Sequence, residues 1–507
     1  MKLCLSDLNL IRESGCAAVP EYSLENMKKN TESNPVWIHF GGGNIFRGFI
    51  AGIQDALLNQ GFEKSGIIVG EGYDSEVISR IYQPFDKLAL RILMYADGSV
   101  DRRVIGGIGA AISCVAGDLD GQGKLLIDAV KKDSLQLISF TITEKGYTAD
   151  EHGIVNTACL LLMARYKSGG APIAMVSMDN CSRNGELLRN KAASCCKRMI
   201  AEGKVDAGFY DYVFLSGKVS FPWTMIDKIT PRPSPIIQRD LEDLGFEDMG
   251  ILETAKHTYI APFVNTESAE YLIVEDNFPN GRPAMERAGV TFTDRETVGK
   301  AERMKVMTCL NPLHTAMAIA GCLLGYKKIS DEMEDSQIVG LIKGVAREGM
   351  KVVTDPGIIS PEDFLNEVIT ERLPNPNIPD TPQRIVTDTS QKIPVRYGMT
   401  LQAYESKWPG SVSKLKFIPF VFALWLRYLY GKDDQGADLP LSSDPRLEEL
   451  TGLVHGEVGQ LEQILEDRTI FGLDLKDVGL SNLVLSFYKD MCSGPGSVRR
   501  ALKRITC

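Results

Sequence analysis

VWIHFGGGNIFR, at residues 36–47, is a short apolar run that ends in three glycines and leads into a helical pattern at residues 46–58. A strand, a glycine turn and a helix in this order are typical of the first part of a dinucleotide-binding unit. Glycines let the backbone approach a pyrophosphate, and the helix N-terminus stabilises its charge. The segment therefore predicts a nucleotide site at the end of the first strand.

The glycine turn departs from the usual fingerprint, because Phe46 stands where the third glycine is expected. A tight strand-to-helix turn without a ligand is the alternative interpretation. An acidic side chain that ends the next strand should bind the ribose hydroxyls. Glu71, with Asp74 as the alternate, follows the apolar run at residues 66–70 and favours NAD over NADP. The expected cofactor-binding residues in this part are Phe40, Gly41, Gly42, Gly43, Asn44, Ile45, Phe46, Arg47 and Glu71.

The chain divides into two regions of different pattern. Further strands are expected at residues 135–142, 173–177 and 212–215, in alternation with helices. This alternation predicts an α/β, Rossmann-like, doubly wound parallel sheet. Beyond Asp294 long helical patterns dominate, and they lie at residues 301–326, 336–353, 417–430 and 447–465. We expect a dinucleotide-binding domain over residues 1–295, a mainly α-helical catalytic domain over 296–507, and the chemistry in the cleft between them.

Composition narrows the class of protein. The hydrophobic content of 44% and charged content of 24% are ordinary for a soluble globular protein, and the net charge of −10 argues against nucleic acid or an anionic membrane as partner. The 11 cysteines show no CxxC or Cys/His ligand spacing, so neither a zinc site nor a disulfide framework is expected. No signal pattern opens the chain, and the apolar run at residues 417–430 is too short to span a bilayer. A cytoplasmic protein is expected.

Five further motifs follow the glycine turn in order. They are TITEKGY at residues 141–147, DNCSRNG at 179–185, FPWTMIDKITP at 221–231, DNFPNGRP at 276–283 and a segment that begins at Glu302. Together with FGGGNIFRG at 40–48, they resemble the long-chain polyol and hexuronate dehydrogenases, a family that includes mannitol 2-dehydrogenases and fructuronate and tagaturonate reductases. The resemblance covers nearly the whole chain. It also implies a cofactor contact by Thr143.

The resemblance implies the catalytic residues. Lys305, Asn311 and His314 fall on the family's E-x-x-K-x-x-x-x-N-x-x-H segment, in which the lysine is the general base, the asparagine holds the carbonyl oxygen and the histidine orients the substrate or the lysine. Asn180 resembles the asparagine that completes the oxyanion pocket, and Asn184 is its rival. Proton-relay roles for Glu144 and Glu302 complete the expected set. No metal is implied.

The spacing within this segment differs from the family's pattern. Five residues separate Lys305 from Asn311, where the family has four. On one straight helix Lys305 and His314 would point about 180° apart. Pro312 clashes with a regular helix, whereas Asn311 suits an N-cap, so we predict a break at residues 308–311 and a second helix over 312–324. The break would turn Lys305 into the cleft.

The expected chemistry is hydride transfer between NADH and a keto carbon, with Lys305 as the proton donor. Lowering a lysine pKa from ~10.4 to ~7.5 disfavours the ammonium by about 4 kcal/mol, which burial and nearby cations could supply. The resemblance assigns Asp227, Arg384 and Lys392 to the substrate hydroxyls or carboxylate. An arginine fork suits a uronate, so a keto-hexuronate is expected as substrate, with a polyol such as mannitol as the alternative. A non-catalytic NAD-binding protein is the third hypothesis, motivated by the extra residue and by Trp223 in place of asparagine.

Overall fold

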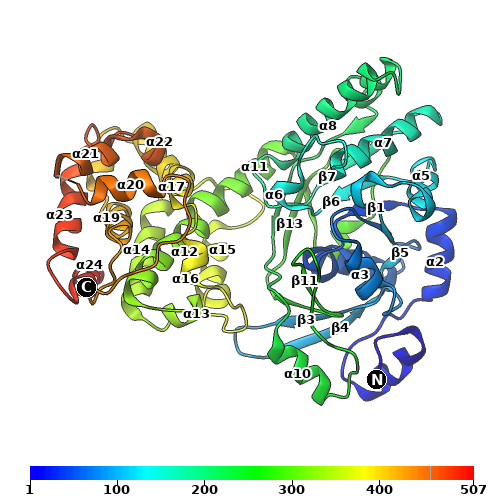
Figure 1. Ribbon diagram of the computed structural model, residues 1–507, viewed down its shortest axis with the longest axis horizontal. Coiled ribbons are helices and arrows are strands. Elements are labelled where there is room, and N and C mark those ends of the chain that lie inside the picture. Colours follow the sequence, from blue (N-terminus) through cyan, green and yellow to red (C-terminus); the bar gives the residue numbers. More distant parts are fainter. Residues whose placement is uncertain (457) are drawn as a thin grey trace. The chain divides into compact units, whose positions relative to one another are not determined.

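The computed structural model describes residues 1–456 and 458–507, and it divides the chain into two compact units (Figure 1). The first unit comprises Met1–Tyr95 and Ser99–Gly299, and the second comprises Ala96–Gly98 and Lys300–Cys507. The first unit is α/β and the second is helical, so the expected fold class is confirmed.

The first unit is built on a six-stranded parallel sheet in the order β5-β2-β1-β6-β7-β8. By chain order within the sheet this is 3-2-1-4-5-6, the arrangement of dinucleotide-binding domains, in which ligands bind beyond the carboxyl ends of the strands. The strands read as continuous apolar runs because helices cover both faces. Their bounds are β1 Trp37–Phe40, β2 Ile67–Glu71, β5 Ile108–Ser113, β6 Leu137–Phe140, β7 Ile173–Ser177 and β8 Val219–Ser220.

One expected strand is wrong. Residues 212–215 lie at the end of helix α9, Gly208–Phe214, rather than in the sheet. Phe209, Tyr212 and Val213 are all buried, and their spacing of three and four residues is the period of a helix face. A short aromatic run therefore looked like a strand, although its burial follows the helical period.

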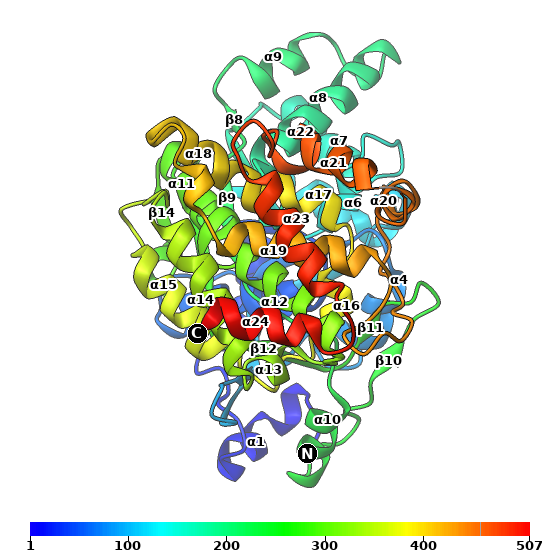
Figure 2. The ribbon, with the colours of Figure 1, turned by 90° about the vertical axis from the view of Figure 1, so that its left-hand side faces the viewer.

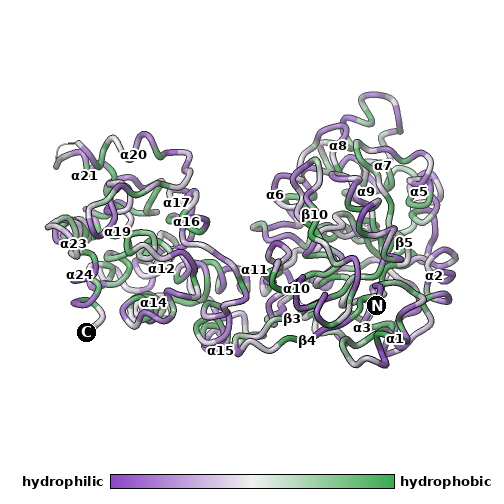
Figure 3. Tube along the Cα trace, turned by 60° about the horizontal axis from the view of Figure 1, so that its bottom comes forward, coloured by the Kyte–Doolittle hydropathy of each residue, from purple (hydrophilic) through white to green (hydrophobic). Residues whose placement is uncertain are grey.

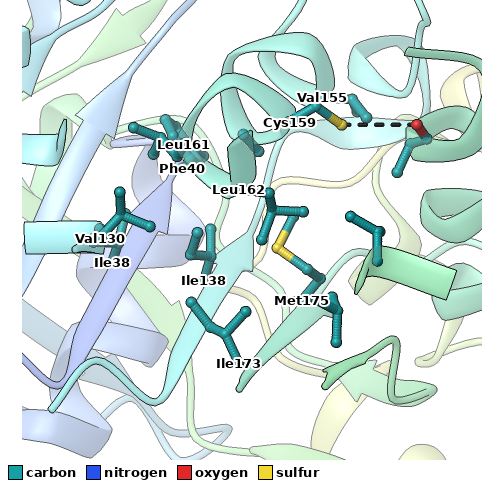
Figure 4. Close-up of a cluster of buried hydrophobic side chains, with 14 of the residues drawn as sticks. Ile38, Phe40, Val130, Ile138, Val155, Cys159, Leu161, Leu162, Ile173 and Met175 are labelled. Carbon is teal, nitrogen blue, oxygen red and sulfur yellow. Dashed lines mark hydrogen bonds between the residues drawn. The ribbon is translucent and has the colours of Figure 1, made fainter. Parts of the chain in front are cut away.

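A hydrophobic core fills the space between the sheet and helices α7 (Ile154–Lys167) and α8 (Asn184–Ala201). Figure 4 shows Ile38 and Phe40 of β1, Ile138 of β6 and Met175 of β7 against side chains of α7 such as Leu162. The Cys159 thiol donates to the Ala192 carbonyl at 3.8 Å. In Figure 3 green, hydrophobic stretches follow the interior strands, and purple residues lie on the outer helices. This packing fixes the sheet edge at which the glycine turn lies.

Two three-stranded sheets and one two-stranded ribbon extend the first unit, and the sequence analysis did not anticipate them. Their orders are β12-β3-β4, β14-β13-β9 and β10-β11. Several of these strands come from residues 219–293, where short runs and turns obscure the period of two. Their bounds are β3 Ala89–Met94, β4 Val100–Ile105, β9 Thr224–Asp227, β10 Leu252–Glu253, β11 Tyr259–Ile260, β12 Phe263–Glu267, β13 Tyr271–Glu275 and β14 Thr291–Thr293.

The other helical segments of the first unit surround these sheets. The α-helices are α1 Leu8–Ser14, α2 Leu24–Ser33, α3 Ala51–Asn59, α4 Ser75–Val77, α5 Lys124–Val130, α6 Thr143–Gly146 and α10 Pro235–Asp243. The π-helical segments are η2 Phe46–Ile50 and η3 Ile78–Tyr82, and the 3-10 turns are η1 Leu5–Asp7, η4 Val115–Gly117, η5 Gly121–Gly123 and η6 Met285–Ala288.

The second unit packs its helices around α12, Asn311–Leu324, whose residues are nearly all buried. Figure 2 looks onto this unit, with α23 and α24 in front of α12 and α14. α12 packs on α14, α16 and α19, and it ends at Gly325, which adopts φ +83. A helix that is apolar all round belongs in a core. Residues 295–324 are also apolar enough by length and composition to cross a membrane, but 83% of the most apolar window is buried inside the protein.

The remaining helices of the second unit have the bounds that the structure gives. They are α11 Arg295–Met304, which begins in the first unit, α13 Ile329–Glu332, α14 Ser336–Met350, α15 Pro361–Glu367, α16 Pro382–Ile385, α17 Thr389–Ile393, α18 Met399–Lys407, α19 Phe417–Leu429, α20 Leu447–Val454, α21 Val458–Glu466, α22 Arg468–Phe471, α23 Ser481–Met491 and α24 Ser497–Thr506. The π-helical segments are η7 Lys305–Cys309, η8 Val368–Arg372 and η9 Pro394–Gly398, and η10 Val412–Lys414 is a 3-10 turn.

Candidate active site

The glycine turn follows β1 and requires glycine at its first position. Gly41 adopts φ +106, and a Cβ there would lie 2.2 Å from the Thr141 carbonyl oxygen. A Cβ on Gly42 would touch the Tyr82 hydroxyl at 3.1 Å, whereas Gly43 has open space around it. The turn leads directly into Asn44, Ile45 and η2. The first amides of a helix have no acceptor within the helix, so the start of this segment is where an anion would be stabilised best.

The side chains around the turn hold it in place. Phe40 stacks on Phe140, and Phe46 stacks on His39 with ring centroids 4.4 Å apart. Arg47 is buried, donates to the Ala261 carbonyl at 2.7 Å and to Asn44 Oδ1 at 2.9 Å, and its pKa is lowered to about 10 by burial. Phe40, Phe46 and Arg47, which were predicted to be cofactor-binding, therefore have their side chains in the protein interior, where they support the turn.

Glu71 ends β2, as predicted, and its carboxylate is bonded to the turn itself. Oε2 accepts from the Gly42 amide at 2.8 Å, and Oε1 accepts from Tyr73 and Asp74 amides. Asp74, the alternate, caps α4 through the Glu76 amide and accepts from the Thr254 hydroxyl at 2.5 Å. Glu71 thus fixes the glycine turn against the second strand at the edge where a dinucleotide binds in this fold.

The TITEKGY and DNCSRNG motifs meet at the carboxyl ends of β6 and β7. The Asp179 carboxylate accepts from the amides of Ile142 and Thr143 and from the Tyr147 hydroxyl. Thr143 adopts φ +61 and is exposed together with Glu144. The two motifs therefore form one hydrogen-bonded structure at the same sheet edge as the glycine turn.

The structure separates the two candidate asparagines. Asn184 is fully buried, and its amide donates to the Asp179 carbonyl and the Thr224 hydroxyl while Oδ1 accepts from the Thr224 amide. Asn180 is exposed directly after β7. The Asn184 amide is thus engaged in the fold, and the roles expected of the two asparagines remain predictions. Asp227 ends β9 and is buried.

The catalytic segment contains a π-helical turn, which is the form that the predicted break takes. The Leu310 amide donates to the Lys305 carbonyl at 3.1 Å, an i→i+5 bond, and Leu310 has non-helical φ −128 and ψ −64. The helix α12 begins at Asn311, so Leu310 and not Asn311 is its N-cap. Pro312 lies in the first turn, where its missing N–H costs nothing.

The π-helical turn absorbs the extra residue. Nine α-helical steps from Lys305 to His314 would rotate the side chains about 180° apart, but one wide turn that takes up a residue reduces the rotation to that of about eight steps, roughly 80°. Thr400 donates its hydroxyl to the Met307 carbonyl at 3.1 Å, and Arg396 donates to the Asn311 carbonyl at 3.4 Å. The irregular backbone is therefore hydrogen-bonded on the side of η9 and α18.

Lys305, Asn311 and His314 lie along this segment. Lys305 is only 1% exposed, so it is removed from bulk water. Within residues 1–456 and 458–507, the Asn311 side-chain amide has no hydrogen-bond partner. Glu302, one turn before Lys305, is half-buried. A buried lysine can exchange a proton with a ketone or alcohol oxygen, and a side-chain amide can donate to such an oxygen.

His314, Asp380 and Arg384 form a polar chain that the sequence did not reveal. Its Nε2 lies 3.6 Å from Asp380 Oδ2, and in the described part of the chain this buried nitrogen has no hydrogen-bond partner. Arg384 donates to both Asp380 oxygens, at 2.6 and 2.5 Å. Burial lowers the pKa of His314 to about 4, with Asp380 opposing the shift and Arg396, Arg384 and Arg372 adding to it. The imidazole is neutral at physiological pH.

Lys392 lies on the following helix, α17. Its ammonium donates to the carbonyls of Ile385, at 3.0 Å, and Thr387. Burial, and then the Arg396 charge, lower its pKa to about 8. The structure therefore brings His314 and Arg384 together through Asp380, and it places Lys392 close enough to Arg396 for their charges to interact. Sequence reasoning missed Asp380 and Arg396, although Asp380 stands one helical turn before Arg384.

Comparison with known proteins identifies the family of the chain. Two family models match the chain, the mannitol dehydrogenase Rossmann domain at residues 36–287 and the mannitol dehydrogenase C-terminal domain at residues 298–492. D-mannonate oxidoreductase of Thermotoga maritima is 46% identical over 516 residues, with 96% of this chain and 95% of the relative covered. Mannitol 2-dehydrogenase of Emericella nidulans is 28% identical, with 87% of each chain covered.

Solved structures give the same picture. A ternary complex of Pseudomonas fluorescens mannitol 2-dehydrogenase with NAD and D-mannitol has a TM-score of 0.73 and 25% identity, and the match covers 100% of this chain and 99% of that one. A substrate-free D-sorbitol dehydrogenase has a TM-score of 0.76 at 23% identity, which indicates a shared fold. Among residues 1–456 and 458–507, no group of three or more His, Cys, Asp or Glu side chains is arranged to hold a metal ion.

Proposed function

Because this chain belongs to the mannitol dehydrogenase family, we propose that it is an NAD-dependent oxidoreductase that interconverts D-mannonate and D-fructuronate. The observation that carries the substrate is the identity of 46% to a D-mannonate oxidoreductase, against 28% to a mannitol 2-dehydrogenase of similar coverage. D-Mannonate carries a carboxylate that D-mannitol lacks. The cations Arg384, Lys392 and Arg396 of the second unit suit a sugar acid.

The residues of the first unit fit NAD. A Cβ on Gly41 would collide with the Thr141 carbonyl and one on Gly42 would be tightly packed, whereas Gly43 is open, so the backbone of the turn can approach a pyrophosphate. The helix start at Asn44 and Ile45 would hold its charge, with Thr143 close to the same sheet edge. Glu71 would serve the adenosine ribose from its place at the end of β2. Bound NAD supplies the acceptor for the hydride in the oxidative direction and, when reduced, its donor.

The residues of the second unit carry the proton. During oxidation the alcohol proton moves from the substrate oxygen to Nζ of neutral Lys305. The hydride leaves the carbon that carries this oxygen. In reduction the ammonium returns this proton to the ketone oxygen. Burial of Lys305 removes hydration that would hold the charged form. Glu302 and Glu144 are proposed to relay the proton to water.

Hydrogen bonds to the reacting oxygen would come from Asn311, Asn180 and neutral His314. Amide N–H donors placed in advance stabilise the charge that develops on this oxygen. Arg384 and Lys392 are proposed to bind the substrate carboxylate or hydroxyls, and Asp227 accepts from a substrate hydroxyl. Asp380 acts as a positioning residue, because it holds the Arg384 fork and faces the His314 ring.

A direct assay tests this proposal. The change in NADH absorbance is measured with D-fructuronate, D-tagaturonate and D-fructose, and in the reverse direction with D-mannonate, D-altronate and D-mannitol. We expect turnover with the fructuronate and mannonate pair. Faster turnover of fructose and mannitol would assign the chain to the mannitol 2-dehydrogenases, which several of its relatives are. NAD binding without turnover of any sugar would select the non-catalytic alternative.

We also propose that the protein works in the cytoplasm. None of the 11 cysteines forms a disulfide in the described part of the chain, and seven of them belong to the first unit: Cys4, Cys16, Cys114, Cys159, Cys181, Cys195 and Cys196. Unpaired thiols suit a reducing compartment. Small sugar acids are the expected partners, rather than nucleic acid or a membrane.

A further inference from the structure

A polar cavity lies in the first unit, beside helix α3. Its volume is about 380 Å³, within the range of sites for small ligands. Figure 1 shows α3 next to β3 and β4, and the cavity lies where η2 and α3 pack on these strands. One wall consists of Phe49, Gly52, Asn59 and Gln60, and the other includes Arg91 and Arg103. None of these residues belongs to the glycine turn or to the proposed catalytic set.

Two arginines face this cavity from directly opposite positions. In the antiparallel pair of β3 and β4, Arg91 is the register partner of Arg103. Like charges directly opposite each other destabilise a sheet, unless something compensates them. Cβ atoms of such partners lie about 5 Å apart, so both guanidinium groups can reach one ligand.

Protein groups do not satisfy these two guanidinium groups. Arg91 Nε is buried and has no hydrogen-bond partner in residues 1–456 and 458–507. Arg91 Nη1 lies 3.5 Å from Glu270 Oε1, but that carboxylate is closer to Lys228 Nζ, at 2.9 Å. In the same described part of the chain, the Arg103 side chain makes neither a hydrogen bond nor an ion pair. A buried donor without a partner is destabilising, so a ligand that accepts from it would bind favourably.

The other carboxylate of the cavity is already engaged. Asp55 is 1% exposed and accepts from the Tyr22 hydroxyl, the Gly106 amide and Asn59 Nδ2. Burial raises its pKa, so its negative charge is disfavoured. Arg91 and Arg103 therefore face two carboxyl groups: Glu270, which is 32% exposed and closer to Lys228, and Asp55, whose charge is opposed by burial although both arginines favour it.

A glycine makes room for the arginine. Gly52 lies inside α3, and a Cβ there would lie 2.9 Å from Arg91 Nη1. Glycine within a helix costs about 1 kcal/mol relative to alanine. The glycine lets the Arg91 guanidinium lie against the backbone of α3, at the floor of the cavity.

We propose that this cavity binds a small organic phosphate monoester. A phosphate dianion offers three terminal oxygens and can accept from two arginine forks at once, whereas a single carboxylate satisfies one fork. The amides of Asn59 and Gln60 and the ring of Phe49 would contact the organic part. Because η2 and α3 continue the helix that starts at the glycine turn, the ligand would stabilise the segment that carries the cofactor loop.

The test is a thermal-shift and calorimetric titration of the full chain in saturating NAD, which fills the other phosphate-binding site. The probes are glycerol 3-phosphate, glucose 6-phosphate, inorganic phosphate and, as carboxylates, acetate and gluconate. We expect at least one ester to bind more tightly than inorganic phosphate, and both carboxylates to bind more weakly. Preferential binding of inorganic phosphate would restrict the ligand to the free anion and would contradict the ester proposal.

Arg103→Gln is the decisive variant, because this half-buried side chain makes neither a hydrogen bond nor an ion pair within the described residues. We expect Arg103→Gln to weaken ester binding tenfold or more, and without ligand to melt at the same or a higher temperature. Arg102→Gln is the matched control, because alternate residues of a strand point to opposite faces. Equal ester affinity in wild type and Arg103→Gln, or no ester binding up to ~10 mM, would overturn the proposal.

Discussion

At the scale of single residues, the candidate site depends on the burial of Lys305 and His314. Lys305 is 1% exposed, and burial lowers the pKa of His314 to about 4. Burial opposes the charged state of both groups, and for His314 this effect outweighs the attraction of the nearby Asp380 charge. A neutral amine and a neutral imidazole are the forms that can accept a proton from an alcohol and hydrogen-bond to its oxygen.

Replacement of Lys305 by methionine removes the proposed acid and base while it keeps most of the buried volume. We expect Lys305→Met to lower kcat about 10³-fold, in the range of general acid–base catalysis, with NADH affinity within a factor of two or so of wild type. Stopped-flow turnover and NADH fluorescence titration measure the two quantities. Lys343→Met, an exposed lysine on α14, is the control. Activity of Lys305→Met at the control's level would remove Lys305 from the mechanism.

The pKa of His314 predicts how its contributions to stability and to catalysis depend on pH. Its folded pKa is depressed from 6.5 to about 4, so the folded protein binds no proton at His314 where the unfolded chain does, and stability is lost as pH falls through this window. Above pH ~5 the ring stays neutral. We expect the ratio of kcat/KM between wild type and His314→Gln to be constant from about pH 5 to 8. A change in this ratio centred near 6.5 would show that the ring titrates during catalysis.

At the scale of elements, the π-helical turn η7 takes up the residue by which the spacing from Lys305 to Asn311 exceeds the expected one. The turn takes up one residue between Lys305 and Asn311, so the residues on either side keep the rotation that a spacing of four would give on a regular helix. The hydroxyl of Thr400 bonds a carbonyl of this turn. We therefore interpret the extra residue as a local adjustment of the helix that is compatible with the proposed roles of Lys305, Asn311 and His314.

Deletion and insertion at Val306 test whether the extra residue is a local adjustment of the helix or disrupts the proposed catalytic arrangement. Val306 is the most exposed residue of the turn, and its deletion leaves the family's four-residue spacing on a regular α-helix. We expect the deletion variant to keep at least about a tenth of wild-type kcat/KM, a loss of no more than ~1.4 kcal/mol. Insertion of one alanine after Val306 should cost more than 10²-fold, because it rotates Lys305 by about 100°. The opposite order of activities would contradict the role assigned to η7.

At the scale of the whole molecule, each unit has its own core, and the helical unit contains one strongly unfavourable buried group. Glu332 is fully buried, and neither carboxyl oxygen has a hydrogen-bond partner in the described part of the chain. A Cβ on Gly321 of α12 would overlap Oε1 of this carboxyl. Burial, and then the charges of Asp331, Asp335 and Asp380, raise its pKa to about 9.

Glu332 should make the protein less stable as pH rises. Its folded pKa lies above the unfolded value of 4.5, so the folded state must keep a proton that the unfolded chain releases, and stability is lost between about pH 4.5 and 9. We expect Glu332→Gln to be more stable than wild type by ~1–3 kcal/mol at pH 8, with little difference at pH 4.5. Denaturant titrations at both pH values measure this. Glu448→Gln, at an exposed glutamate of α20, is the control, and a pH-independent difference between Glu332→Gln and wild type would contradict the assignment.

Sequence alone determined the features that local chemistry encodes. The strand, glycines and helix at residues 36–47 predicted the dinucleotide-binding fold, because Gly41 needs a positive φ and the strand is apolar on both faces. The change of hydrophobic period beyond Asp294 predicted a helical second region. The ordered motifs identified the family, which the matches over residues 36–287 and 298–492 confirm. The roles of Lys305, Asn311 and His314 remain predictions.

Only the tertiary structure decided how distant residues combine. Residues 212–215 form a helix because packing on one helical face outweighs the strand propensity of aromatic residues. Asp380 meets His314 across 66 positions of sequence, and Asn184 bonds Thr224, so no local pattern could reveal either contact. The form of the helix adjustment at residues 305–310 also depends on hydrogen bonds from Thr400 and Arg396, which are brought there by folding. Local patterns record backbone preference and burial, whereas the partner of a polar side chain is fixed by which segments pack together.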